Sequence, residues 1–221
     1  VYVQVKWFAQ DDDKQRHVAD EDGFMVLAYD ESLLEQTDIL GLVDQDVLVA
    51  DVDRGVVAEV ITDLEYQSLV ASLNEEQRRI YNDIYAHASQ MQNAIVNSSV
   101  QPLYMFVSGP GGVGKSHTIR AIRHMLPRIL NEKDPNYPVC LATATTGAAA
   151  EQINGNTINS ALGLGKSNED LKPMSAQMRD MLRCRYRYLR YIVIDEVSML
   201  SSKHLLNISE RLKEITACYS S

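Results

Sequence analysis

Eight residues near the middle of the chain have the types and the spacing of a phosphate-binding loop. Residues 109 to 116 read Gly-Pro-Gly-Gly-Val-Gly-Lys-Ser, which fits the pattern G-x-x-x-x-G-K-[ST] without a mismatch. Glycines in such a loop let the backbone curl, so that consecutive N–H groups surround phosphate oxygens. Lys115 can place its charge on the outer phosphates, and the Ser116 hydroxyl can ligate a magnesium ion. The sequence therefore predicts a nucleotide phosphate site formed by Gly109, Pro110, Gly111, Gly112, Val113, Gly114, Lys115 and Ser116.

The residues on both sides of this loop match the strand and the helix that such a loop connects. Residues 103 to 107 (Leu-Tyr-Met-Phe-Val) are a continuous apolar run, typical of a strand buried on both faces. After the loop, Ile119, Ile122 and Leu126 recur at helical spacing, and Pro127 is expected to end the helix. This context favours a phosphate site over a glycine-rich turn that binds nothing.

A second apolar run is followed directly by two carboxylate residues. Residues 191 to 194 (Tyr-Ile-Val-Ile) are typical of a buried strand, and Asp195 and Glu196 follow at once. Ligands of parallel sheets bind beyond the carboxyl ends of the strands. We therefore expect Asp195 to hold the magnesium ion, through water, and Glu196 to orient and deprotonate an attacking water. Glu196 and Lys115 are the predicted catalytic residues, and a solvated acidic turn is the alternative.

Composition limits the class of protein. With 221 residues and 45% hydrophobic content, the chain can form one core domain and an appendage. It has no apolar run of 18 residues and no signal peptide at its start, and it lacks an initiator methionine, so we expect a fragment. Its three cysteines (Cys140, Cys184 and Cys218) lie far apart, which suits a reducing intracellular compartment.

Charge and pattern divide the chain near Asn74. Residues 1–73 carry 17 acidic and 4 basic residues, whereas residues 74–221 carry 13 acidic and 17 basic ones, so only the second part suits a polyanionic partner. We expect 1–73 to be an acidic, β-containing segment, with strands at 24–28, 47–50 and 56–61 and a helix near 32–36.

The pattern after residue 74 predicts an α/β domain over 74–221. Ile80, Ile84, Ala88 and Met91 share a helix face. A strand is expected at 139–143, and helices at 146–153, 175–188 and 203–214. Strands that alternate with helices indicate a parallel sheet. Right-handed crossovers would place the phosphate-loop strand and the Asp-Glu strand next to each other.

Four blocks of this part resemble the motifs of one family. Residues 73–77 (Leu-Asn-Glu-Glu-Gln) are similar to its glutamine motif, and 109–116 to its motif I. Residues 143–150 (Thr-Ala-Thr-Thr-Gly-Ala-Ala-Ala) and 153–162 (Ile-Asn-Gly-Asn-Thr-Ile-Asn-Ser-Ala-Leu) resemble its motif Ia region, and 194–200 (Ile-Asp-Glu-Val-Ser-Met-Leu) its motif II. The family is the PIF-type DNA helicases of superfamily one, including the helicase modules of Helitron-like transposable elements. The resemblance covers about residues 73–215.

The resemblance implies a RecA-like P-loop NTPase core that works as an ATP-driven motor, moving 5′ to 3′ on single-stranded DNA with Mg²⁺ as cofactor. ATP and single-stranded DNA are the implied partners, with no membrane, and the nucleus is favoured over the mitochondrion or cytoplasm. DNA repair, recombination and telomere maintenance are the implied cellular roles.

The resemblance also assigns roles to single residues. Gln77 reads the adenine edge in such proteins, whereas the residues themselves also predict a capping pair of Gln77 with Asn74. DNA contacts are implied for small hydroxyl residues and an amide, which position phosphates: Thr143, Thr146, Thr157 and Asn159. The family usually has proline where Thr145 stands and histidine where Asn159 stands, which weakens the expected DNA contact at 159.

The chain ends 25 residues after Glu196, before the family's sensor glutamine, its second motor domain and the arginine that reaches the γ-phosphate. From this we expect nucleotide binding with slow hydrolysis and without translocation. We also expect an incomplete sheet that leaves apolar surface exposed near Ile194 and Val197.

Other interpretations remain open. One is another P-loop NTPase, such as a kinase or a switch GTPase, although no base-reading N/T-K-x-D motif lies on a suitable element. Another is a non-catalytic, transposon-derived remnant that binds nucleotide. Separately, the arginines between 183 and 190 alternate with tyrosines. That run predicts either a nucleic-acid surface or, as we prefer, a solvated helix end whose tyrosines pack inward.

Overall fold

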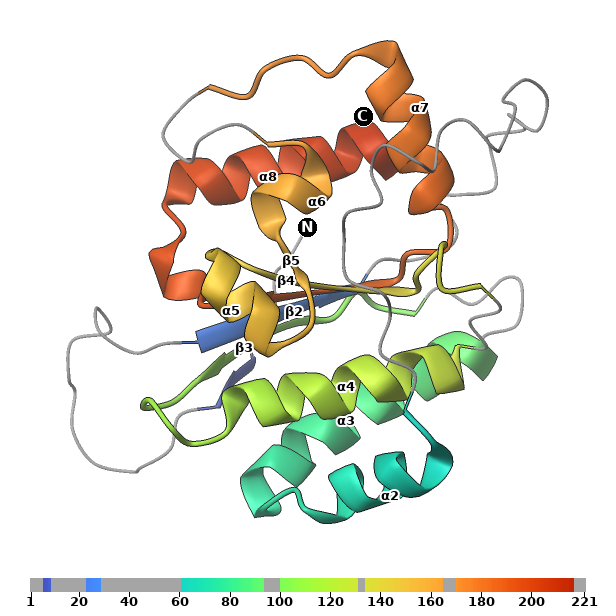
Figure 1. Cartoon of the computed structure of the whole chain (residues 1–221), viewed down its shortest axis with the longest axis vertical. Coiled ribbons are helices and arrows are strands. Elements are labelled where there is room, and N and C mark those ends of the chain that lie inside the picture. The colour runs from blue at the N-terminus through green and yellow to red at the C-terminus, as the bar shows by residue number, and fades with distance from the viewer. Residues whose placement is uncertain are drawn as a thin grey trace.

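The protein, seen in a computed structural model, forms three layers with a six-stranded sheet between two layers of helices (Figure 1). The structure describes residues 6–8, 23–28, 61–93, 100–130, 134–164 and 170–216. The strands are β1 (Lys6–Phe8), β2 (Gly23–Ala28), β3 (Tyr104–Ser108), β4 (Cys140–Ala144), β5 (Asn156–Thr157) and β6 (Tyr191–Asp195). The α-helices are α2 (Asp63–Ala71), α3 (Glu75–Asn93), α4 (Lys115–Ile129), α5 (Gly147–Gln152), α6 (Ile158–Leu162), α7 (Ala176–Arg185) and α8 (Ser202–Thr216), with a short 3₁₀ helix, η2 (Val197–Met199).

The order of the strands corrects one expectation from the sequence. The order is β1-β3-β2-β6-β4-β5, so β3, which leads into the phosphate loop, does not lie next to β6. Strand β2 lies between them and runs antiparallel to both, pairing Phe24 with Val107 of β3 and Val26 with Val193 of β6. Crossover rules apply to consecutive parallel strands and do not foresee a strand inserted from an earlier part of the chain. Because β3 and β6 both run opposite to β2, their carboxyl ends still share one edge of the sheet.

The same strand overturns the expectation of exposed apolar surface at the end of β6. Ile194 is fully buried, and Val197 is 6% exposed. Ile194 pairs with Met25 of β2, and η2 packs beside β2. The predicted strand at 24–28 is thus confirmed, and it covers the edge of β6 that we expected to be open.

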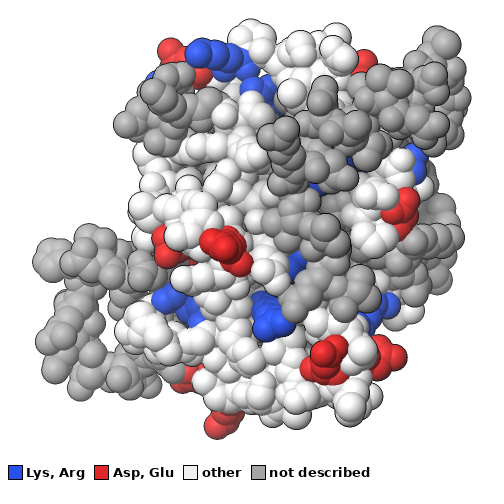
Figure 2. Space-filling view, in the orientation of Figure 1, with Lys and Arg blue, Asp and Glu red and all other residues white. Residues whose placement is uncertain are grey.

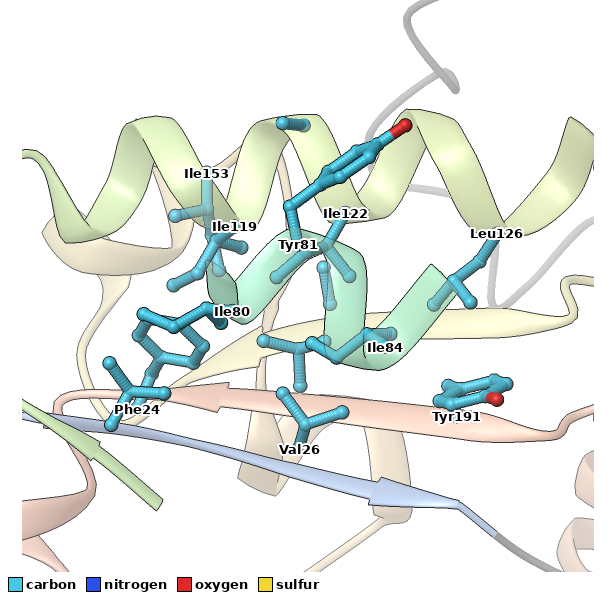
Figure 3. Close-up of a cluster of buried hydrophobic side chains, with 14 of the residues drawn as sticks. Phe24, Val26, Ile80, Tyr81, Ile84, Ile119, Ile122, Leu126, Ile153 and Tyr191 are labelled. Atoms are coloured by element: carbon cyan, nitrogen blue, oxygen red, sulfur yellow. The ribbon is translucent and has the colours of Figure 1, made fainter. Parts of the chain in front are cut away.

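Alternate residues of β6 enter two separate hydrophobic cores, as the period of two of a strand requires. Tyr191 and Val193 face α3 and α4, and they pack there with Phe24 and Val26 (Figure 3). Ile192 and Ile194 face α6, α7 and α8 on the other side of the sheet. All five residues of β6 are buried, which confirms the run 191–194 as a central strand.

Strand β3 differs from the prediction that it is buried on both faces. Met105 and Val107 are buried, whereas Tyr104, Phe106 and Ser108 are only half-buried. Among the described residues, the second core takes its strand residues from β4 and β6. The helices α6 to α8 thus cover the other side of the sheet, and β3 receives full cover only from α3 and α4.

Helix α4 continues past the proline that was expected to end it. Pro127 lies inside the helix, which ends at Ile129. A proline removes one N–H donor, but the following residues keep theirs, and the N–H of Leu130 still donates to the carbonyl of Leu126 at 2.9 Å. Arg128 stabilises this end, since its guanidinium bonds to the carbonyl of His124 and stacks over the Tyr66 ring of α2 at 4.4 Å.

Residues on both sides of position 74 contribute strands to the one sheet, because β1 pairs with β3 and β2 pairs with β3 and β6. The division into an acidic segment and an NTPase domain stays a prediction. The expected helix at 32–36 and the expected strand at 47–50 lie outside the described residues, and so do residues 56–60 of the other expected strand. Among the described residues, no helix is long and apolar enough to cross a membrane.

A substitution in β2 tests whether this strand belongs to the core. Phe24 is fully buried between β3, β6 and α3, so Phe24→Ala should lower the free energy of unfolding by about 3–5 kcal/mol. Met25 is only half-buried in the same strand, so Met25→Ala is the matched control and should cost less. Urea denaturation measures both. Equal midpoints for Phe24→Ala and the unsubstituted chain would show that β2 does not pack in the core.

Candidate active site

The phosphate-loop sequence forms a turn between β3 and the first residue of α4, which confirms the predicted strand–loop–helix arrangement. Gly112 and Gly114 have φ values of +82° and +85°, a region that side chains strongly disfavour. Gly114 is the N-cap of α4, so the N–H groups of the first helical turn have no acceptor within the helix and point toward the loop. Backbone donors and the helix dipole together make this position suited to an anion.

Lys115 folds over the loop backbone. Its Nζ donates to the carbonyl of Gly109 at 2.7 Å and to the carbonyl of Pro110 at 3.1 Å. These bonds keep the ammonium beside the loop N–H groups, where it can meet phosphate oxygens. The Lys115 side chain is flexible, so a rotation alone would let its ammonium leave the loop carbonyls and bind phosphate oxygens instead.

Gln77 joins helix α3 to the phosphate loop. Its backbone N–H donates to Oδ1 of Asn74 at 2.9 Å, and its Oε1 accepts from the N–H of Asn74 at 3.0 Å, which is the predicted capping pair. Its Nε2 donates to the carbonyls of Val113 and Gly114, at 3.0 and 3.4 Å. The helix cap is therefore confirmed, and a contact of Gln77 with adenine stays a prediction.

A pocket of about 90 Å³ lies between the start of α3 and the loop. Asn74, Glu76, Gln77 and Arg79 line it on one side, and it continues to Lys115. Ligand sites are commonly about 300–1,000 Å³, so a nucleotide would fill this pocket with one part and extend over the open loop with the rest. Its position beside Gln77 suits the base, because the phosphates must lie at the glycine-rich turn.

The two predicted acids occupy different environments at the end of β6. Asp195 is only 4% exposed, and its Oδ1 accepts the N–H of Glu196 at 2.9 Å. Glu196 is half-buried and has a left-handed backbone, with φ of 51° and ψ of 43°. A non-glycine residue held in this region costs about 1–3 kcal/mol, and such strain is typical of functional sites.

Thr145 holds the strained turn and was missed as a site residue. Its Oγ1 donates to the carbonyl of Glu196 at 3.3 Å and lies 3.6 Å from Sδ of Met199. The backbone N–H of Met199 donates to the same carbonyl at 3.1 Å. In the sequence, Thr145 stood out only as a threonine where the resembling family has proline. A proline there has no hydroxyl and could not make this bond.

The loop and the acids lie two strands apart, since only β2 separates β3 from β6. Adjacent strands are about 4.8 Å apart, so the distance across the gap is roughly 10 Å. That spacing leaves room for the outer phosphates of a nucleotide and a cation. Ser116 and Asp195 are oxygen donors on opposite sides of it, which fits a magnesium ion that keeps water and phosphate ligands. The described residues contain no cluster of three or more His, Cys, Asp or Glu side chains that could hold a metal by themselves.

The three threonines expected to contact DNA already make hydrogen bonds within the protein. Thr146 caps α5 by accepting the N–H of Ala149 at 3.2 Å, and Thr157 caps α6 by accepting the N–H of Ser160 at 3.3 Å. Both hydroxyls keep a proton to donate, so DNA contact there stays a prediction. Asn159 has a buried Oδ1 with no hydrogen-bond partner among the described residues. Thr143 is fully buried and donates to the carbonyl of Val193 at 2.9 Å, so its expected role in DNA contact is wrong.

A glycine-rich phosphate loop at a helix start and an Asp-Glu pair at the same sheet edge define the chain as a P-loop NTPase of the α/β class. Residues 72–220 match the sequence model of the family described as PIF1-like helicase, and the chain belongs to that family. The fold is accordingly RecA-like, although the strand between β3 and β6 is antiparallel here.

Curated proteins support the assignment. The chain is 30% identical over 174 residues to "ATP-dependent DNA helicase PIF1" of Candida albicans, which covers 76% of this chain and 18% of that protein. It is 34% identical over 115 residues to "ATP-dependent DNA helicase Pif1" of Psychrobacter sp., covering 50% of this chain and 16% of that protein. A match to "ATP-dependent DNA helicase PIF7" of Trypanosoma brucei brucei covers 59% and 11%, at 31% identity.

The chain therefore spans about a tenth to a fifth of the length of these curated relatives. No solved structure matches it significantly.

A glycine pair tests the contact between Gln77 and the loop. A Cβ at Gly114 would lie 2.5 Å from Nε2 of Gln77 and would also need a left-handed backbone, whereas a Cβ at Gly111 would meet nothing within 4 Å. Gly114→Ala should therefore lower the free energy of unfolding by about 1–3 kcal/mol, and Gly111→Ala should change it little. Denaturation without ligand measures both. Equal stabilities would show that Gln77 does not constrain the loop.

Proposed function

We propose that this chain is the nucleotide-binding part of an ATP-dependent DNA helicase. The whole helicase would couple ATP binding and hydrolysis to 5′-to-3′ movement along single-stranded DNA. The observation that carries the proposal is the position of the phosphate loop and Asp195-Glu196 at one edge of the sheet, within a PIF1-like sequence. We infer Mg²⁺ as the cofactor. Ser116 and Asp195 would hold it, and it would neutralise charge on the outer phosphates.

The other roles in nucleotide binding and hydrolysis fall to individual residues of the chain. The loop N–H groups and Lys115 would bind the phosphates and stabilise the charge that develops on them during transfer. Glu196 would accept a proton from the attacking water, and Thr145 would keep its backbone in the required turn. Gln77 would contact the base from the pocket beside α3, while its hydrogen bonds to the loop hold base and phosphate sites at a constant distance.

Single-stranded DNA is the proposed track. We place it near the N-terminal ends of α5 and α6, where Thr146, Thr157 and Asn159 lie. Thr145 immediately precedes Thr146 and bonds to Glu196, so one short segment joins the proposed DNA side to the proposed catalytic carboxylate. For the parent protein we propose a nuclear location and work in DNA repair, recombination and telomere maintenance, as extensions of the family assignment.

Loss of the loop lysine should abolish nucleotide affinity without unfolding the chain. Lys115 bonds only to loop carbonyls among the described residues, so Lys115→Ala should remove most of the Mg-ATP affinity, by about 100-fold or more. Lys213, half-exposed on α8, supplies the matched control Lys213→Ala. Isothermal titration with Mg-ATP measures both. Equal affinity of the Lys115 variant and the control would contradict the assignment of the loop.

The carboxylate assigned to water activation can be separated from binding. Glu196→Gln keeps the size of the side chain and removes the base, so the variant should bind Mg-ATP normally and hydrolyse it at least about 100-fold more slowly. Single-turnover hydrolysis, with protein in excess over labelled ATP, detects even slow turnover. Glu210→Gln on the exposed side of α8 is the control. Binding without measurable hydrolysis by the unsubstituted chain would favour a non-catalytic nucleotide-binding protein.

A further inference from the structure

A group of one charged and two aromatic side chains lies at the opposite edge of the sheet from the phosphate loop. Tyr137 precedes β4, and Arg187 and Tyr188 precede β6; we call these three residues the Arg-Tyr cluster. Because β4 and β6 are neighbouring parallel strands, the residues before them meet at the amino edge. Each strand has five residues, so the cluster lies roughly 17 Å from the carboxyl edge where Asp195 and Glu196 are. It belongs to neither the nucleotide site nor the proposed DNA contacts at α5 and α6.

The guanidinium of Arg187 lies over the faces of two aromatic rings. Its Cζ lies 3.9 Å from the centroid of the Tyr137 ring and 4.9 Å from that of the Tyr188 ring. The two rings meet edge to face, with centroids 6.4 Å apart and an interplanar angle of 87°. Ring faces attract a cation but do not neutralise it. The contacts therefore fix the direction of the guanidinium and leave its charge available.

The charge of Arg187 has no acidic partner in the described part of the chain. Its Nε is buried without a hydrogen-bond partner there, and no carboxylate of the described residues pairs with the guanidinium. Residues 176–191 hold five arginines and one acid, Asp180. Arg183 donates from its guanidinium to the backbone carbonyl of Glu214, at 3.0 and 3.3 Å, and it too makes no ion pair with a carboxylate of the described residues. Figure 2 shows that basic and acidic side chains are interspersed over the described part of the face in view.

The tyrosines between residues 186 and 191 differ in how far they are exposed to solvent. Tyr186 is 5% exposed and donates to the carbonyl of Ala161 at 2.8 Å, and Tyr191 is fully buried in the core. Both confirm the expectation of inward packing. Tyr188 is 51% exposed, so for this residue the expectation is wrong. Its position in the turn between α7 and β6 keeps it out of both cores and leaves aromatic surface open to solvent.

We propose that the Arg-Tyr cluster is a contact site for single-stranded nucleic acid, with a base stacked on Tyr188 and a backbone phosphate bound by Arg187. An exposed aromatic ring beside a guanidinium that has no carboxylate partner in the described part of the chain supplies the two elements by which unpaired strands are bound without sequence preference. A duplex keeps its bases stacked and cannot use the ring. An acidic peptide would use the arginine but would gain nothing from the aromatic face.

Binding of a fluorescently labelled deoxythymidine oligomer, followed by anisotropy without nucleotide, tests the proposal. Tyr188→Leu keeps apolar bulk and removes the aromatic face, and it should weaken binding about five-fold or more, whereas Tyr188→Phe should bind like the unsubstituted chain. Arg187→Gln should weaken binding and reduce the dependence on salt concentration by about one phosphate contact. Tyr85→Ala and Arg120→Ala remove an exposed tyrosine and an exposed arginine from α3 and α4, and they should leave affinity unchanged.

Each outcome decides the matter. Weaker binding by Tyr188→Leu and Arg187→Gln, with both controls and Tyr188→Phe unaffected, supports the site. Loss with Arg187→Gln alone indicates a general anion or acidic-peptide surface and overturns base stacking. Equal binding by all variants, or no binding by the unsubstituted chain, overturns the proposal. Circular dichroism of each variant excludes loss of fold. The nucleotide assignment is judged separately, because Lys115→Ala should bind the oligomer normally even though it loses ATP.

Discussion

The antiparallel pairing of β2 with both β3 and β6 is the interaction on which the site depends. β3 presents the phosphate loop and β6 presents Asp195 and Glu196, yet these two strands make no direct pair. Their spacing and relative height are set by the register of β2, which matches Val107 with Phe24 and Val193 with Val26. Since the backbone of a central strand bonds on both sides, a shift of β2 would move the two halves of the site relative to each other.

In this site the phosphate loop is held in place by hydrogen bonds, and the backbone of Glu196 is strained. Gly112 and Gly114 allow the positive φ values of the loop, and Gln77 holds the loop carbonyls through its side-chain amide. Glu196 adopts a left-handed backbone without being glycine, and Thr145 and Met199 hold its carbonyl. A side chain that is held in an unfavourable backbone conformation needs such bonds, because otherwise it would relax to a commoner one. The hydroxyl of Thr145 also ties the Glu196 backbone to the segment that leads into α5.

The two edges of the sheet carry different electrostatics. At the carboxyl edge, backbone donors and one lysine face two carboxylates across roughly 10 Å, which suits a phosphate chain with a bridging cation. At the amino edge, Arg187 is stacked on rings and has no carboxylate partner among the described residues, which suits a polyanion without a metal. The strands β3, β4 and β6 run in one direction, so the segments that follow them lie at the carboxyl edge and the segments that precede them lie at the amino edge, which separates these chemistries.

The sequence encodes the chemistry of the phosphate loop, the strands predicted at 24–28 and 191–194, the helices around them and the family, because local spacing and hydrophobic period carry this information. It did not determine the neighbour of β6, the half-buried state of β3 or the course of α4 past Pro127. Strand neighbours depend on pairing between distant segments, and burial depends on which helices cover each strand. The bond from Thr145 to Glu196 and the contact of Arg187 with the Tyr137 ring likewise join residues 50 or more positions apart. Only the tertiary structure brings them into contact.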